Sequence, residues 1–120
     1  MSDTPNHEIS SQLTDAQVEC LTLYRKIKSG QLTLKHASST RLTLRGQPTT
    51  EGAFLGIVQQ GRNNIKKAVA TIVLGVWLGY IELEDLRRLS DMISKLERGN
   101  VDQFHLVSPV VNQLIDRMVL

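Results

Sequence analysis

Cysteine is almost absent from this 120-residue sequence, in which Cys20 is the one thiol. A single cysteine excludes an intrachain disulfide and any metal site built from several cysteines. Chains without disulfides are typical of reducing compartments, so we expect a cytoplasmic protein. The polar, acidic amino-terminal segment also lacks the basic start and apolar centre of a signal peptide.

Aromatic residues are scarce as well, at 4% of the sequence. A core built from this chain must therefore be mostly aliphatic. Proteins that bind single-stranded nucleic acid commonly stack the bases on aromatic side chains. The scarcity therefore argues against a single-stranded partner.

The sequence has no apolar run long enough to cross a bilayer. The longest run, residues 68–81, covers 14 positions, whereas a membrane-spanning helix needs about 20. We therefore expect no membrane partner. We predict that 68–81 is a buried helix covered by the other helices, in which Ile72 and Trp77 matter to folding and little to binding.

Residues with the usual catalytic or metal-binding arrangements are also missing. His7, His36 and His105 lie in separate segments, without a second ligand at metal spacing. No glycine-rich phosphate loop is present, and no two carboxylates share an environment that would separate their pKa values. We therefore predict that the chain is not an enzyme and holds no metal or cofactor.

Acidic residues are missing from one long stretch, because none occurs between Glu51 and Glu82. Residues 25–67 contain nine Lys or Arg and one acid, a local charge of +8, although the whole chain carries only +2. Arg25, Lys26 and Lys28 lie where the last turn of a helix is expected, a position that suits cations. The remaining excess of positive charge indicates an anionic partner.

Helix signals divide the rest of the chain. Residues 1–12 have no helical period and are predicted to be a flexible tail before a single helical domain at 13–120. Thr14 and Gln17 have the spacing of a capping box, and Gly30 is expected to end that first helix. A second amphipathic pattern covers 83–98. Ser108-Pro109 are expected to start a last helix, whose end docks on its own fold or on a partner.

Residues 31–48 allow two interpretations, which the sequence leaves open. Alternating leucines predict a short β-hairpin at 32–45. In the other interpretation, Thr33 caps a short helix through Ala37, and a loop follows up to Pro48.

The segment 50–81 begins with Thr50, a good helix N-cap, and carries one apolar stripe through Gly61. Glycine inside a helix costs about 1 kcal/mol relative to alanine, which favours a break there. The uninterrupted stripe favours one helix, whose length would suit a dimer. The sequence does not decide between these alternatives.

The fold class predicted from these signals is mainly α, a compact bundle of four to five helices with a helix-turn-helix-like arrangement. The residue pattern of a standard helix-turn-helix does not fit. With Ala37 as its buried alanine, the turn glycine falls near Arg41, and with Gly61 in the turn, Lys67 occupies an apolar position. Only a divergent variant is therefore expected.

The outward face of the long helix combines basic and amide side chains, which contact phosphates and base edges in the major groove. We predict that double-stranded DNA is the partner of a small, dimeric transcriptional regulator or chromatin-associated factor. An alternative is a non-catalytic helical subunit that docks on another protein through its carboxyl-terminal helix. The predicted DNA-binding residues are Lys35, Arg41, Arg45, Gln59, Arg62, Asn63, Lys66 and Lys67.

Overall fold

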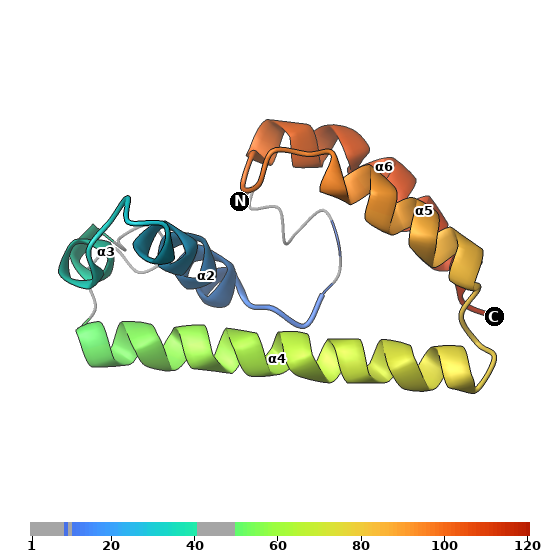
Figure 1. Cartoon of the computed structure of the whole chain (residues 1–120), viewed down its shortest axis with the longest axis horizontal. Coiled ribbons are helices and arrows are strands. Elements are labelled where there is room, and N and C mark those ends of the chain that lie inside the picture. Colours follow the sequence, from blue (N-terminus) through green and yellow to red (C-terminus); the bar gives the residue numbers. More distant parts are fainter. Residues whose placement is uncertain (1–8, 10, 41–49) are drawn as a thin grey trace. The chain divides into compact units, whose positions relative to one another are not determined.

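The computed structural model describes residues 9, 11–40 and 50–120, and these are mainly helical, as the sequence predicts (Figure 1). The chain divides into two compact units, one formed by residues 11–67 and the other containing residues 68–120. The single domain at 13–120 stays a prediction, and the predicted tail lies mostly outside the described residues. The described helices are α2 (Asp15–Lys28), α3 (Leu34–Thr40), α4 (Glu51–Trp77), α5 (Leu83–Ser94) and α6 (Val101–Met118).

The ends of α2 follow the sequence signals. The Thr14 hydroxyl accepts a hydrogen bond from the Gln17 amide at 3.1 Å, and the Gln17 side-chain oxygen accepts one from the Thr14 amide at 3.1 Å. This is the predicted capping box. Gly30 has a φ of 81° and donates its amide to the Ile27 carbonyl, while Gln31 donates to Lys26. This pair of bonds is a Schellman ending, in which glycine takes the left-handed position without steric cost.

Residues 34–40 settle part of the choice between hairpin and helix. They form α3, and the Thr33 hydroxyl accepts a hydrogen bond from the His36 amide at 3.1 Å. The expected first strand of the hairpin at 32–45 is therefore helical from Leu34 onward, because this cap stabilises the first turn. The remainder of that hairpin, which includes Arg41 and Arg45, lies outside the described residues.

α4 is one continuous helix, and Gly61 does not break it. Thr50 caps it as predicted, since its hydroxyl accepts the Ala53 amide at 3.0 Å. α2 and α3 pack on its first half around a small core with an aliphatic majority. Gly61 is itself buried, and a Cβ added there would lie 2.8 Å from Cδ1 of Leu21. The glycine is therefore a point of close approach between α2 and α4. The buried members of this core are Cys20, Ala37, Phe54 and Val58.

In the second unit, α5 and α6 lie side by side and run antiparallel (Figure 1). The Glu82 amide donates to the Met118 carbonyl at 2.8 Å, and Ile81 forms an antiparallel bridge with Val119. The carboxyl end thus pairs with its own chain, one of the two outcomes expected for it. Asp85 is buried between the helices, with an oxygen 3.0 Å from Arg117 and 3.4 Å from Arg88.

The predicted start of the last helix at Ser108-Pro109 is wrong. α6 begins at Val101, where the Asn100 side chain accepts the Gln103 amide at 3.0 Å. Ser108 is buried inside the helix, and its hydroxyl donates to the Phe104 carbonyl at 2.8 Å. The Asn100 cap forms nine residues before the proline, so Pro109 lies within an established helix.

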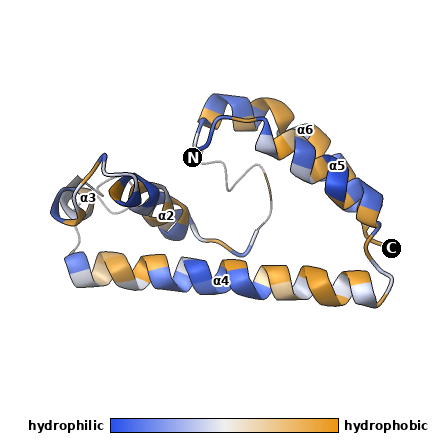
Figure 2. Ribbon diagram, in the orientation of Figure 1, coloured by the Kyte–Doolittle hydropathy of each residue, from blue (hydrophilic) through white to orange (hydrophobic). Residues whose placement is uncertain are grey.

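The predicted burial of residues 68–81 is also wrong. Figure 2 shows that hydrophobic residues dominate the last part of α4, yet Trp77 is 79% exposed and Val73 is 61% exposed. In the first unit the core contacts of α4 come from Phe54 and Val58, upstream of this segment. No helix in the described part of the chain combines the length and apolar character that crossing a bilayer requires. The cytoplasmic location stays a prediction.

Candidate anion-binding surface

The close approach at Gly61 determines which charged side chains meet in the first unit. Leu21 of α2 lies against Gly61, so the middle of α2 packs on the middle of α4. One helical turn beyond Leu21 is Arg25, and Arg62 directly follows Gly61. Basic residues that are far apart in the sequence thereby come together.

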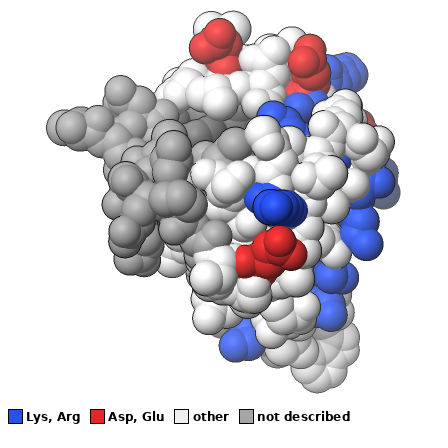
Figure 3. Space-filling view, turned by 90° about the vertical axis from the view of Figure 1, so that its left-hand side faces the viewer, with Lys and Arg blue, Asp and Glu red and all other residues white. Residues whose placement is uncertain are grey.

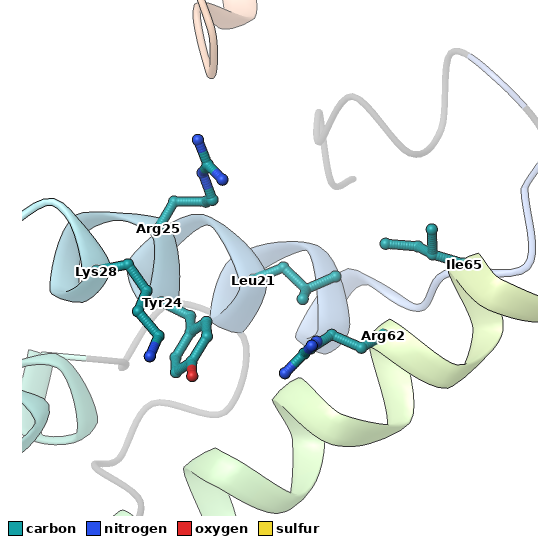
Figure 4. A pocket seen from close by; sticks show the side chains of 6 residues that line it. All are labelled: Leu21, Tyr24, Arg25, Lys28, Arg62 and Ile65. Carbon is teal, nitrogen blue, oxygen red and sulfur yellow. The ribbon is translucent and has the colours of Figure 1, made fainter.

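A pocket of about 460 Å³ lies at this junction (Figure 4). Three of its lining residues are basic and none is acidic. Figure 4 shows Lys28 and Tyr24 of α2 and Arg62 of α4 directed toward the same space, whereas Arg25 points to the other side of α2. The lining residues are Leu21, Tyr24, Arg25, Lys28, Arg62 and Ile65.

The Lys28 ammonium nitrogen lies 5.4 Å from the centre of the Tyr24 ring. This distance is within the range of a cation–π contact, which orients the ammonium group without neutralising it. Lys28, Arg25 and Arg62 are all exposed to solvent. The pocket therefore presents positive charge to any anion that approaches it.

The residues predicted on α4 all lie on the surface, and their side chains are exposed. The Gln59 amide nitrogen donates to the Asn63 side-chain oxygen at 3.1 Å, one turn along the helix. Arg62 lies between them on the same face, and Lys66 lies on that face one helical turn beyond Arg62. Figure 3 shows basic side chains along one side of the described surface in a view of the α3 end.

The remaining predicted residues are less closely connected to this surface. Lys35 is exposed on α3 but does not line the pocket. Lys67 is exposed on α4 and is not among the lining residues either. Arg41 and Arg45 lie outside the described residues, so their placement stays a prediction. The structure thus joins Arg62 with α2, and it does not join Lys35 to the same pocket.

Sequence reasoning missed the contribution of α2. Arg25 and Lys28 were assigned only to the favourable position of cations at a helix C-terminus. That role and a binding role are compatible, because an exposed cation near a helix end remains available to an anion. The local charge of residues 25–67 included both side chains and was the signal that could have found them.

Asn64 has a structural role at the edge of the surface. Its amide nitrogen donates to the Gln17 side-chain oxygen at 3.1 Å and to the Gln12 carbonyl at 3.4 Å. These bonds connect α4 to the capping box of α2. They fix the direction in which α2 leaves its N-cap and therefore help to position its basic last turn.

Within the described ranges, no three His, Cys, Asp or Glu side chains are arranged to hold a metal ion. Comparisons of the chain with protein-family models, with curated proteins and with solved structures give no match. Functional conclusions therefore depend on the chemistry of the surface itself.

Proposed function

We propose that the chain binds double-stranded DNA through a basic surface formed by the last turn of α2 and the middle of α4, acting as a transcriptional regulator or chromatin-associated factor. The observation that carries the proposal is that Lys28 of α2 and Arg62 of α4 are directed toward one pocket, whose lining includes Arg25 and no acidic residue. Lys66 extends the positive charge one turn further along α4.

Charge favours a polyanion over a small anionic ligand. The basic groups continue beyond the pocket along α4, and the open face also carries Gln59 and Asn63. Phosphate contacts by Arg and Lys position a protein on a duplex, while amide side chains read adenine edges. A small anion would use the pocket alone and would leave this polar face without a role.

The arrangement of the first unit is compatible with this role. Three helices share one core, and Ala37 of the short helix is completely buried in it. A divergent helix-turn-helix-like arrangement, expected from the sequence, is part of the proposal. The cationic face of α4 would then lie against the DNA backbone.

The test is a titration of labelled duplex DNA, followed by fluorescence anisotropy at several salt concentrations. Each neutralised phosphate contributes about −0.9 to the slope of log K against log salt. The four cations Arg25, Lys28, Arg62 and Lys66 therefore predict a slope near −4. The double variant Arg62→Ala/Lys66→Ala removes two of them, and its slope should fall to about −2.

A matched control removes the same charge elsewhere. Lys95 and Arg98 are exposed in the connection between α5 and α6. The variant Lys95→Ala/Arg98→Ala should keep the affinity and slope of the unmodified chain. Absence of binding at low salt, or an equal loss of slope in the control, would refute the proposal.

A second candidate function is a non-catalytic helical subunit of a larger assembly. The observation that favours it is the exposed apolar surface at the end of α4, including Val73 and Trp77. Deleting residues 108–120 would not test it, because Met118 and Val119 pair with residues 81 and 82 of the same unit. The substitution Trp77→Glu is the better test, since it should abolish binding of a partner and leave that pairing intact.

A further inference from the structure

The last three turns of α4 carry an exposed apolar strip on one side of the helix. At about 100° per residue, its members fall within an arc of about 140°, broad enough to form one helix-packing face. Trp77, the one tryptophan in the sequence, is its largest and most exposed member. We define the apolar strip as Val69, Ile72, Val73, Val76 and Trp77.

The apolar area of the strip is large enough to suggest that another molecular surface packs on it. From its exposed fractions, it leaves on the order of 500 Å² of apolar side chain in contact with water, comparable to the largest patches found on monomers. A stable interface covers about 800 Å² on each partner. The strip alone supplies more than half of that area on one helix.

Charge favours one orientation of a partner helix. Arg62, Lys66 and Lys67 precede the strip on α4, and no acid lies between Glu51 and Glu82 to offset them. Two parallel copies of α4 would place these cations beside their twins. Antiparallel copies would place them at opposite ends, where the repulsion between them is screened.

Side-chain size favours the same orientation. With a two-fold axis beside Val73, Trp77 of each copy faces Val69 of the other, a large side chain against a small one. Such alternation fills an interface efficiently. Parallel copies would instead place the two bulky indole rings opposite each other.

We propose that a second copy of this chain covers the apolar strip, through antiparallel pairing of α4 about a two-fold axis near Val73. The interface is isologous, because the same surface is used on both copies. It goes beyond the proposed function, for which one basic surface is sufficient.

The first experiment uses the whole chain without DNA, so that its failure is separate from failure of the proposed function. Light scattering should give twice the mass of one chain at high concentration. On dilution, the emission of Trp77 should shift to the red as the indole ring becomes exposed to water. A chain that stays monomeric at every concentration overturns the dimer, whether or not it binds DNA.

The variants Val73→Glu and Trp77→Glu should each raise the dissociation constant of the dimer by roughly 100-fold or more, because a charge would be buried in the interface. The control is Leu106→Glu, whose side chain on α6 is 81% exposed and is not part of the strip. It should leave the mass unchanged, and circular dichroism should show the same helix content in all three variants. A dimer that persists in both strip variants overturns the assignment of the interface.

Orientation is tested by oxidation of variants that each carry one added cysteine. A mixture of Val69→Cys and Trp77→Cys chains should form a disulfide between the two different chains. Buried Cys20 is the background, and the unmodified chain is its control. Cross-linking of Val69→Cys chains only with one another would contradict the antiparallel arrangement. A monomer whose Trp77 emission is blue at every concentration would contradict the dimer, because the chain would then cover its own strip.

Discussion

Replacing Gly61 with alanine tests the close approach of α2 and α4 on which the basic surface depends. The added Cβ would lie 2.8 Å from Cδ1 and 3.2 Å from Cγ of Leu21, and 3.4 Å from Cβ of Gln17. Leu21 is half-buried against the core and also lines the pocket, so the extent to which it can shift toward that space sets the cost of the contact. Gly56 is the matched control, since it lies in the same helix and an added Cβ there has nothing within 4 Å.

Two effects of opposite sign determine the result at Gly61. Alanine stabilises a helix interior by about 1 kcal/mol relative to glycine, and this gain applies at both positions. Overpacking a contact costs about 1–3 kcal/mol, and this cost applies only at Gly61. Gly56→Ala should therefore raise the free energy of unfolding by about 1 kcal/mol, whereas Gly61→Ala should range from no change to a loss of about 2 kcal/mol.

Urea denaturation followed by far-ultraviolet circular dichroism gives these free energies. Hydrogen exchange of the α2 amides assigns any change to the first unit. In the background Leu21→Ala, the Gly61→Ala substitution should regain at least about 1 kcal/mol, because the obstructing side chain is gone. If Gly61→Ala stabilises the protein as much as Gly56→Ala, α2 does not lie against Gly61, and the shared pocket of Lys28 and Arg62 loses its structural basis.

Two further substitutions test the second unit and the start of α2. Asp85→Asn should lower the free energy of unfolding by about 1–2 kcal/mol, because the buried carboxylate loses its charged contacts with Arg117 and Arg88. The loss stays this small because both arginine side chains are exposed to solvent. Denaturation of the exposed variant Asp91→Asn should show no comparable loss, and equal losses would contradict this explanation. Thr14→Ala should cost about 1 kcal/mol by removing the capping box, measured as faster hydrogen exchange in the first turn of α2. Unchanged exchange there would show that the Gln17 contacts hold the turn without the threonine hydroxyl.

The ends of several helices could be predicted because their signals act over a few residues. Thr14 bonds to an amide three residues away, as do Thr33 and Thr50, and Gly30 ends α2 by adopting a positive φ. Such contacts need no partner from elsewhere in the chain. The exception is the start of α6, where Ser108-Pro109 resembled a cap and first turn, but Asn100 provides an earlier one.

The candidate site could be predicted only in part. The residues on the outer face of α4 followed from helical spacing, because positions three and four apart share one side of a helix. The participation of Arg25 and Lys28 depends on α2 lying beside Arg62, a contact between residues more than thirty positions apart. Periodicity within one segment contains no information about such a contact.

The sequence by itself determined that this protein is mainly helical and that its positive charge is concentrated between residues 25 and 67. Tertiary structure decided whether the helix continues through Gly61 and whether the apolar segment after it is buried. Gly30 ends α2 by adopting a positive φ, whereas Gly61 stays helical, and its missing side chain admits Leu21. Likewise, an apolar segment is buried only where another surface reaches it, and the described residues leave Val73 and Trp77 exposed. The physical reason is that local hydrogen bonds are determined by neighbouring residues, whereas burial depends on what the rest of the chain, or a second chain, brings into contact.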